Sequence, residues 1–422
     1  MNIYTSILLW VTYIVTLYFS LFFFLVFFDK KLMPPSLTHR RGRLASFPFV
    51  SIIIPAYNEE ETIVDTIASV LALDYPPDRF EVLIVDDGST DGTRACVEKY
   101  INDKPVATLI THQNMGKAAS LNHALCRAKG EFFACLDADS FVEPHALQDM
   151  LGLYYETNNP DLAIITPVLK VKSPHNLLQK VQWIEYLVMI LVSRLASNLD
   201  CLYVAPGPFS LYKTSIIQKL GGFDEHNLTE DQEIAYRVQS HHYTIKQCPT
   251  AFVHTITPDT VPSFYRQRRR WYKGSISCLY KYRNLILNRR YGDFGIIQML
   301  KNSFGFLVAL SGVGFSFYFI VWPVIQRIYH LSLVGFDFWP YINHLTISFN
   351  ILSVDIQKTF IVLVLFFIGF VFFYAAHRNA HERVNKMGII PIIPYFFVYY
   401  ILKGGILLLS VVEYSLKKDH KW

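Results

Sequence analysis

Hydrophobic residues are distributed unevenly along the chain, in long runs toward both ends and in short runs between them. Residues 4–28 are almost wholly apolar and aromatic, and at 1.5 Å per helical residue this run is long enough to cross a bilayer. A cleaved signal peptide is disfavoured, because the run is too long and no small-residue cleavage site follows it. Further apolar runs occupy residues 303–324, 359–376 and 389–412.

The last of these runs is unusual for a transmembrane helix. Pro391, Pro394 and Lys403 interrupt residues 389–412. A proline or a lysine at membrane depth is tolerated mainly where the segment is kinked, re-entrant or lines a polar path. The pattern therefore predicts either a fourth span or a re-entrant segment.

Between the long runs, residues 48–260 show the pattern of a soluble α/β domain. Short apolar segments alternate with polar helical ones, and each apolar segment runs into a turn that contains Gly, Asp or Pro. The expected strands are Phe49–Ile54, Val82–Val85, Ala107–Ile110, Phe132–Leu136 and Ala163–Thr166. This alternation predicts a mostly parallel, Rossmann-type sheet, in which ligands bind beyond the carboxyl ends of the strands.

Two stretches are amphipathic and aromatic rather than membrane-spanning. Residues 178–197 interrupt an apolar helix with Lys180, Glu185 and Arg194, and residues 264–285 combine many basic residues with aromatic rings. Such helices lie in the membrane interface, with basic groups toward phosphates and rings toward acyl chains. An ordinary core helix of the globular domain is the alternative for the first stretch.

Basic residues beside the apolar runs predict the topology. The first run is followed by Lys30, Lys31, Arg40, Arg41 and Arg43, which places the middle of the chain in the cytoplasm. The expected organisation is a transmembrane helix at 1–30, a cytosolic domain at 31–260, amphipathic interface helices at 261–300 and about three spans at 301–422.

The C-terminal third fits this scheme less well. The stretch at 325–358 is expected to be an extracytoplasmic, partly interfacial loop, and basic residues at 378–386 place the next loop in the cytoplasm. Four spans would then leave Lys417, Lys418 and Lys421 outside, against the positive-inside rule.

Composition agrees with a membrane protein that has a cytosolic domain. Of the 422 residues, 52% are hydrophobic and only 17% are charged, whereas soluble domains carry about 25% charged residues. The net charge of +5 is too small and too scattered to indicate nucleic-acid binding. The six cysteines show no CxxC or Cys/His metal spacing, which favours free thiols in a reducing compartment.

Residues able to carry chemistry follow the ends of the predicted strands. The turn after the first strand contains Ala56, Tyr57 and Glu59, and free backbone N–H groups at such a strand-to-helix turn suit a nucleotide. A plain helix cap explains this turn equally well. After the second strand, Asp87 is able to accept hydrogen bonds from uracil or ribose, or it belongs to an ordinary Asp/Gly turn.

Phosphate and metal ligands are expected next along the chain. Lys117 follows a glycine turn and is able to meet a phosphate, although surface lysines are common. Asp137 and Asp139 follow the strand at 132–136. Two such carboxylates share Mg²⁺ or Mn²⁺ with substrate phosphate oxygens, and burying them without a cation would be costly.

Two later motifs suit the transfer step itself. Glu230 and Asp231 begin a helix; the alternatives are a helix cap and a general base that deprotonates an acceptor hydroxyl, for which Asp231 is the choice. In Gln267-Arg268-Arg269-Arg270-Trp271 the arginines are able to hold a diphosphate, and the indole offers a flat face to a sugar ring. A generic basic membrane-surface helix is the alternative.

In this order and at these spacings, the motifs resemble those of processive, membrane-integrated family 2 glycosyltransferases such as cellulose, hyaluronan, chitin and poly-N-acetylglucosamine synthases. The resemblance covers about residues 48–285. It implies a GT-A-like fold, a UDP-sugar donor, Mg²⁺ or Mn²⁺, and inversion by direct displacement. No clear counterpart of the cellulose synthase gating-loop motif FxVTxK follows Trp271.

The resemblance also implies roles for individual residues. The donor would be bound by Ala56, Tyr57, Glu59, Asp87, Lys117, Asp137, Gln267 and Arg270. The acceptor would meet Trp271 and the segment Gly207-Pro208-Phe209, and the catalytic pair would be Asp231 and Glu230. The metal would lie on Asp137 and Asp139, with His254 as a further ligand where related chains often carry an acid. A structural histidine is the alternative for His254.

Three functions compete on these grounds. The first is an integral, plasma-membrane synthase that extends a polysaccharide and passes it through its own helices, a second copy or a partner subunit. The second adds one sugar to a lipid phosphate or glycolipid among the surrounding lipids. The third is a transporter or receptor with a degenerate nucleotide-binding domain, which the joint presence of Asp87, Asp137, Asp139 and Asp231 disfavours.

Overall fold

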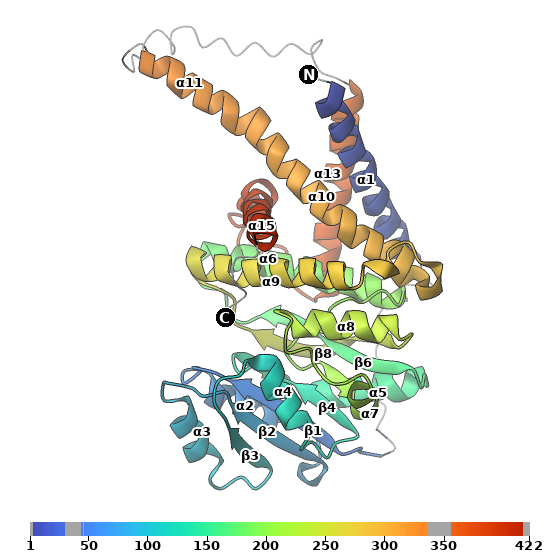
Figure 1. The fold of residues 1–422 in the computed structure, drawn as a ribbon, viewed down its shortest axis with the longest axis vertical. Helices are drawn as coiled ribbons and strands as arrows, with labels where there is room; N and C mark the ends of the chain where they lie inside the picture. Colours follow the sequence, from blue (N-terminus) through green and yellow to red (C-terminus); the bar gives the residue numbers. More distant parts are fainter. Residues whose placement is uncertain (1–2, 30–43, 45, 334, 336–355, 417–422) are drawn as a thin grey trace.

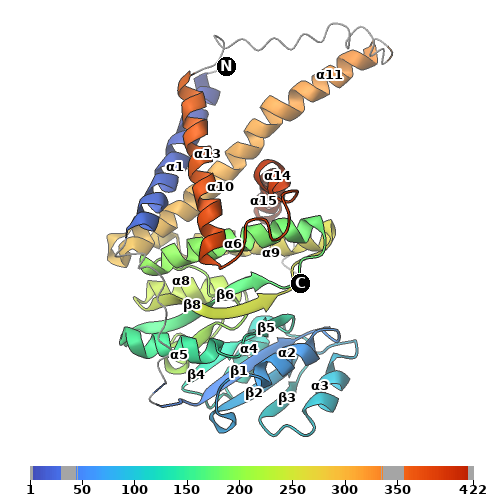
Figure 2. The ribbon, with the colours of Figure 1, turned by 180° about the vertical axis from the view of Figure 1, so that it is seen from behind.

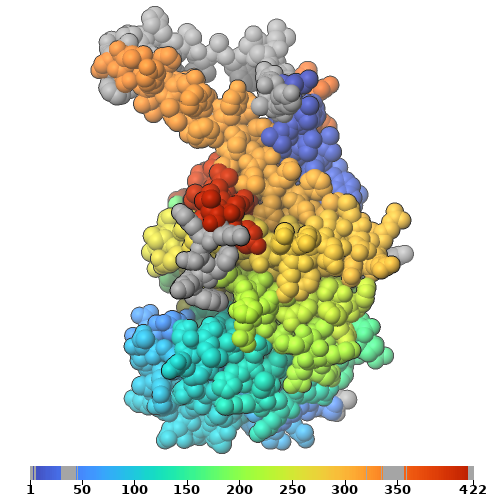
Figure 3. Space-filling view, in the orientation of Figure 1, coloured from blue at the N-terminus to red at the C-terminus, as the bar shows by residue number. Residues whose placement is uncertain are grey.

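The computed structural model describes the chain except for residues 1–2, 30–43, 45, 334, 336–355 and 417–422. An α/β domain occupies one end of the long axis and a group of apolar helices occupies the other (Figure 1). The α/β half is the bulkier part of the molecule, and α11 projects away from the remaining helices (Figure 3). The described chain therefore divides into an α/β part and a part of apolar helices where the apolar pattern changes.

Within the described residues, eight strands form one sheet in the order β3-β2-β1-β4-β7-β6-β8-β5. The strands are β1 (Val50–Ala56), β2 (Phe80–Asp86), β3 (Ala107–Thr111), β4 (Phe132–Cys135), β5 (Ser140–Val142), β6 (Leu162–Val171), β7 (Leu211–Lys213) and β8 (Thr244–Thr255). The pairs β1/β2, β2/β3, β1/β4 and β6/β8 are parallel. The pairs β4/β7, β6/β7 and β5/β8 are antiparallel. The predicted mostly parallel α/β sheet is confirmed.

The sheet is buried on both faces because its strands are apolar on both. Ile52 and Ile54 belong to one buried cluster and Ile53 to the other, as the twofold alternation of strand side chains requires. Full burial of each such side chain contributes roughly 1.5–3 kcal/mol.

Short helices cover these faces and lead into or out of the strand-end turns. They are α2 (Ile63–Leu71), η1 (Pro77–Arg79), α3 (Thr93–Ile101), α4 (Lys117–Leu125), α5 (Ala146–Thr157), α7 (Thr214–Lys219) and α8 (Glu230–Ser240). Helix α2 shows why they pack: Ile63, Thr66, Ile67 and Val70 recur every three or four residues and are all buried.

Two long helices, α6 (Leu177–Asn198) and α9 (Val261–Lys281), lie side by side between the sheet and the apolar helices (Figures 1 and 2). Each begins at a capping box, with Asn176 before α6 and Thr260 before α9. More than half of the residues in α6 are buried. Helix α6 therefore fits the core-helix alternative better than a helix exposed in the membrane interface.

The predicted apolar runs are helical where the structure describes them. Helix α1 (Ile3–Phe28) packs beside α13 (Ile356–Asn379), and both run along the long axis (Figure 2). Short turns at η2 (Arg283–Leu285) and η3 (Arg289–Tyr291) precede η4 (Phe294–Gln298), α10 (Met299–Ser316), η5 (Phe317–Val321) and α11 (Trp322–Leu333). Together η4 to α11 make one continuous 40-residue helix, longer than the predicted span at both ends.

The last apolar run consists of α14 (Ile392–Pro394), η7 (Tyr395–Tyr399) and α15 (Tyr400–Ser415). Among the described residues, four helices are long and apolar enough to cross a membrane, and this segment is one of them. Most of the predicted extracytoplasmic loop at 325–358, like the basic groups at 30–43 and 417–421, lies outside the described residues.

Candidate active site

A cavity of about 310 Å³ lies at the carboxyl ends of β1, β2 and β4. It is lined by Pro55, Ala56, Tyr57, Glu59, Asp87, Asn114, Gly116, Lys117, Ser120, Asp137, Ala138, Asp139 and Arg270. Seven of the eight residues predicted to bind the donor are in this set; the eighth, Gln267, lies one helical turn before Arg270 on α9. The fold thus gathers motifs that are more than 200 residues apart in sequence.

Asp87 is held rigidly at one wall of the cavity. Its two carboxylate oxygens accept hydrogen bonds from the backbone N–H groups of Met115 (2.8 Å) and Gly116 (2.9 Å). The Nδ1 atom of His112 lies 3.3 Å from Asp87 Oδ1. These contacts bind the β2 turn to the turn before α4, so the position of Asp87 is set by backbone rather than by flexible side chains.

The turn after β1 is fixed in a similar way. Asn58 adopts a left-handed conformation with φ of 56°, which asparagine tolerates better than most residues. Its side-chain oxygen accepts a hydrogen bond from the N–H of Thr90 at 2.8 Å. Glu59 accepts a hydrogen bond from Thr62 (2.8 Å), and burial is the main cause that raises the pKa of Glu59.

Lys117 is the charged centre of the site. Its Nζ lies 2.5 Å from Asp137 Oδ1 and 2.9 Å from Glu230 Oε1, so it connects the metal motif to the predicted catalytic pair. Burial alone would lower the pKa of Lys117, but the two carboxylates raise it above its usual value. A Cβ atom on Gly207 would lie 2.8 Å from this ammonium and 2.9 Å from Asp137, so a larger residue there would displace the pair.

Asp139 lies among other negative charges in a buried position. Burial, and then the charges of Asp137 and Glu59, raise the pKa of Asp139 to about 7. Hard oxygen ligands on a cavity wall suit Mg²⁺ or Mn²⁺, and a divalent cation would relieve this repulsion. No group of three His, Cys, Asp or Glu side chains able to hold a metal occurs among the described residues, so phosphate oxygens would have to complete the coordination.

Asp231 lies on the first turn of α8, next to the segment that precedes β7. Its carbonyl oxygen accepts a hydrogen bond from the N–H of Ala205 (3.2 Å). Burial, and then the charge of Glu230, raise the pKa of Asp231 to about 7. A carboxylate poised near neutrality is suited to remove a proton, whereas Glu230 is occupied by Lys117.

The residues of the last motif, on α9, differ in their exposure and in their contacts. Arg270 is exposed and lines the cavity. Trp271 is half-buried, with the Arg268 guanidinium 4.1 Å from its ring centroid. Arg268 itself is buried. The prediction of a generic basic membrane-surface helix is therefore not supported for Arg268.

Two predicted residues are placed away from these roles. Nε2 of His254 lies 2.9 Å from Glu143 Oε1, and His254 joins no group of three metal-ligating side chains, so a metal role has no support in the described structure. Phe209 is fully buried in the core, because its turn, with φ of 59°, directs the ring inward. The Phe209 ring is therefore not exposed to a ligand in this structure, while Gly207 of the same segment lies close to Lys117.

Sequence reasoning missed His112 and Ser120, which support or line the site. His112 directly follows β3, and Ser120 lies in the first turn of α4 within 3.3 Å of His112 Nε2. The rule that ligands gather beyond strand ends would have found His112. The turn after this strand was interpreted through Gly116 and Lys117 alone, which left His112 out.

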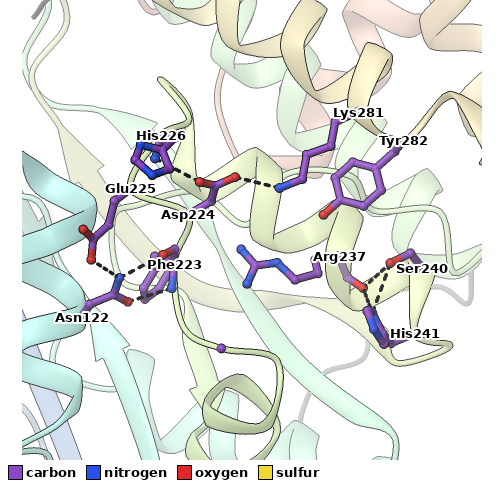
Figure 4. Close-up of a pocket in the computed structure, with 11 residues that line it drawn as sticks. Asn122, Phe223, Asp224, Glu225, His226, Arg237, Ser240, His241, Lys281 and Tyr282 are labelled. Atoms are coloured by element: carbon purple, nitrogen blue, oxygen red, sulfur yellow. Dashed lines mark hydrogen bonds and ion pairs between the residues drawn. The ribbon is translucent and has the colours of Figure 1, made fainter.

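A second cavity, of about 650 Å³, is lined by residues of α4, α8 and α9 and of the loops beside them, and by none of the predicted residues (Figure 4). Several of its polar groups are already paired: Lys281 lies 2.7 Å from both Asp224 and the buried Glu233, and the Asn122 amide donates a hydrogen bond to Glu225 at 2.8 Å. Size alone therefore does not mark the reactive site.

Comparison with known proteins agrees with this geometry. Residues 51–221 match the family model described as glycosyl transferase family 2. These residues form a family 2 glycosyltransferase domain. The match includes the cavity-lining turns of β1, β2 and β4 and ends before α8 and α9.

Curated relatives extend the similarity beyond this glycosyltransferase domain. The chain is 26% identical over 370 residues to the poly-beta-1,6-N-acetyl-D-glucosamine synthase of Staphylococcus epidermidis, covering 86% of this chain and 82% of that protein. It is 30% identical over 231 residues to the synthase of the same name from Staphylococcus aureus strain COL, covering 54% and 55%. With its apolar helices, the chain is a membrane glycosyltransferase.

A solved structure shares the overall fold of this glycosyltransferase. The mannosyltransferase PcManGT from Pyrobaculum calidifontis, in complex with GDP-Man and Mn²⁺, superposes with a TM-score of 0.62 at 18% identity, covering 98% of this chain and 99% of that one. The likeness covers the apolar helices as well as the α/β domain, so both parts belong to the shared architecture.

Proposed function

We propose that this glycosyltransferase transfers a sugar from a UDP-sugar to the end of a growing polysaccharide at the cytoplasmic face of the membrane, with inversion and with a divalent cation. The observation that carries the proposal is the single cavity that gathers Tyr57, Asp87, Lys117, Asp139 and Arg270. These side chains provide contacts for a base, a ribose, a diphosphate and a cation in one place.

The nucleoside would lie across the turns after β1 and β2. Tyr57 is an exposed aromatic ring at the cavity and offers a stacking face to uracil. The Asp87 carboxylate is already oriented by two backbone N–H groups, and its remaining acceptor capacity suits a uracil N–H or a ribose hydroxyl. We infer that Glu59 and Ala56 complete this wall.

The diphosphate would lie between Lys117 and Arg270, the two cations of the cavity wall. When bound, Mg²⁺ or Mn²⁺ on Asp137 and Asp139 would neutralise the charge that develops on the leaving group. Lys117 is already paired with Asp137, so an incoming phosphate would share or replace that contact. The chain thereby holds positive charge where the nucleotide departs.

Asp231 is proposed as the base that accepts the proton of the acceptor hydroxyl as that oxygen attacks the anomeric carbon. Direct displacement inverts the anomeric configuration and needs one base and no covalent intermediate. The neighbouring Glu230 is held by Lys117 at 2.9 Å. Glu230 would therefore position Lys117, while Asp231 accepts the proton.

Trp271 is proposed as the platform for the acceptor sugar. Its ring is fixed from behind by Arg268 at 4.1 Å, which restricts its rotation. The Staphylococcus relatives are named as polysaccharide synthases, which favours a polymer over a single addition to a lipid. The basic residues that flank the spans favour a catalytic domain in the cytoplasm, and a plasma-membrane location is proposed from the polysaccharide chemistry.

The test is a panel of radiolabelled UDP-sugars offered to the purified full chain in lipid with Mg²⁺ or Mn²⁺. A ladder or high-molecular-weight product from one donor supports the proposal and identifies the sugar. A single short, lipid-soluble product would overturn the polymer assignment. If the chain neither hydrolyses any UDP-sugar nor transfers sugar from one, the choice of donor is wrong.

A further inference from the structure

The last apolar segment carries two charged residues, and both are paired with the catalytic side of the molecule. Lys403 and Glu413 lie ten residues apart on α15, the helix Tyr400–Ser415. Charges within an apolar segment are costly unless they meet partners in protein or in water. Their partners therefore indicate where this helix lies.

Lys403 joins a buried cluster formed by side chains of α6, α9 and η7. Its Nζ lies 2.6 Å from Glu185 Oε1, while Glu185 Oε2 accepts hydrogen bonds from Arg268 (2.6 Å) and from the Tyr399 hydroxyl (2.6 Å). Glu185 and Arg268 are both less than a tenth exposed. Burial alone would raise the pKa of Glu185, but Arg268 and Lys403 hold it below its usual range.

Glu413 makes the matching contact with α9. Its Oε2 lies 2.5 Å from Arg269 Nε and 2.6 Å from Lys273 Nζ. Arg268 is thus held by Glu185, and Arg269 is held by Glu413. These two arginines directly precede Arg270, which lines the donor cavity, and Trp271. We call the seven residues Glu185, Arg268, Arg269, Lys273, Tyr399, Lys403 and Glu413 the helix seam.

The spacing of the two charges fixes the direction of α15. Ten helical residues span about 15 Å, yet both ends of this stretch touch the layer formed by α6 and α9. A helix leaving this layer along the membrane normal would touch it at one end only. Figures 1 and 2 agree, since α15 is seen nearly end-on while α1 and α13 run up the long axis.

We propose that α15 does not cross the membrane but lies across α6 and α9 on the catalytic side, where Lys403 and Glu413 position the helix that carries Arg270 and Trp271. Tyr399, Lys403 and Glu413 are positioning residues, because they act through Glu185, Arg268, Arg269 and Lys273. The topological part stands on geometry alone, and the positioning part rests on the proposed function.

This arrangement also removes a conflict in the charge pattern. After α13, the loop returns to the catalytic domain, since Glu382 Oε1 lies 3.5 Å from Lys170 Nζ. If α15 stays on that side, Lys417, Lys418 and Lys421 follow it there, as the positive-inside rule requires. A fourth span would place the same lysines outside.

The topology is tested with the full chain carrying green fluorescent protein or alkaline phosphatase after residue 422. Fluorescence without phosphatase activity is expected, because the first reporter matures in the cytoplasm and the second outside it. Phosphatase activity without fluorescence would overturn the proposal. This experiment needs no enzymatic activity, so its result is independent of the proposed substrate.

The positioning role is tested with Glu413→Gln, which keeps the size of the side chain and removes its charge. We expect the donor KM to rise about tenfold, less than the hundredfold that a full 1 Å misplacement can cost, with size-exclusion behaviour unchanged. Glu413→Asp should restore most of the affinity. Glu98→Gln, which breaks the exposed pair between Arg94 and Glu98, is the matched control and should leave KM unaltered.

An unchanged donor KM in Glu413→Gln would overturn the positioning role. If that variant does not fold, Lys403→Met provides the second measurement, because it removes the ion pair of the helix seam between Lys403 and Glu185 on α6. Normal donor KM in folded Lys403→Met would likewise overturn the role. Absence of transfer by the unmodified chain would instead count against the proposed function and leave the reporter result intact.

Discussion

The donor cavity and the helix seam both contain buried carboxylates, yet these carboxylates respond in opposite ways. In the cavity, burial and neighbouring carboxylates raise the pKa of Asp139 to about 7. In the seam, Arg268 and Lys403 hold the pKa of Glu185 below its usual range despite comparable burial. The sign of the neighbouring charge, rather than burial, decides the outcome.

This difference in neighbouring charge distinguishes a ligand-binding site from a structural contact between helices. The cavity has an excess of carboxylates that an incoming cation can neutralise, and it stays open toward solvent along residues such as Tyr57. In the seam each carboxylate contacts at least two basic residues, so its negative charge is already balanced. We therefore expect the first cluster to change its charge state when a cation binds, and the second to keep it.

The largest expected effect comes from removing one cavity carboxylate. Asp139→Asn should reduce transfer by about a thousandfold, because a divalent cation contributes several kcal/mol at a leaving diphosphate. Rates at several Mn²⁺ concentrations measure this effect. The fold should be unaffected, since the substitution also lessens repulsion with Asp137. Full activity in Asp139→Asn would remove the metal role.

Loss of the proposed base should cost somewhat less. Asp231→Asn should lower kcat a few hundredfold, within the range of general base catalysis, while donor affinity measured by calorimetry stays near its original value. The control is Asp224→Asn, which removes a carboxylate of the second cavity that pairs with Lys281. A kcat for Asp231→Asn close to that of the unaltered chain would show that another group accepts the proton.

In the seam, a similar substitution should affect stability before chemistry. Glu185→Gln leaves Arg268 and Lys403 without their shared carboxylate and should lower the free energy of unfolding by roughly 3 kcal/mol. Denaturant titration in detergent measures this change, and Glu98→Gln should change stability by less than about 1 kcal/mol. Equal stability of the two variants would contradict the distinction between a buried ion-pair cluster and an exposed surface ion pair.

The smallest effect is a pH dependence. Because the pKa of Asp231 is raised to about 7, its basic form is lost as pH falls through that value, and kcat should fall toward tenfold per pH unit below it. Above pH 7 the rate should level off. A cation on Asp139 would keep that group ionised, so at saturating Mn²⁺ the profile should report Asp231. A flat profile from pH 5.5 to 8 would rule out this base.

Much of the fold could be predicted because its signals are local. The five predicted strands correspond to β1, β2, β3, β4 and β6, and all four apolar runs are helical. The strands β5 and β7 have three residues each, too few for a pattern to show. Strand β8 contains Pro249 inside a register shift against β6, and proline normally argues against a strand.

The site could be predicted as a set of motifs but not as a set of contacts. Strand ends fix the places of Asp87, Asp137 and Asp139, and these lie together as expected. No local signal shows that Lys117 joins Asp137 to Glu230, or that Lys403 meets Glu185 over 218 positions of sequence. Such pairs depend on how distant helices pack, which spacing along the chain does not encode.

The continuous helix from η4 to α11 has a consequence for the surrounding bilayer. Its 40 residues correspond to about 60 Å at 1.5 Å per residue, twice the hydrocarbon thickness of about 30 Å. Only part of the helix can be solvated by lipid at once, so it must tilt steeply or extend into water. The lipid composition of the host membrane would then set the angle at which this rod leaves the catalytic domain.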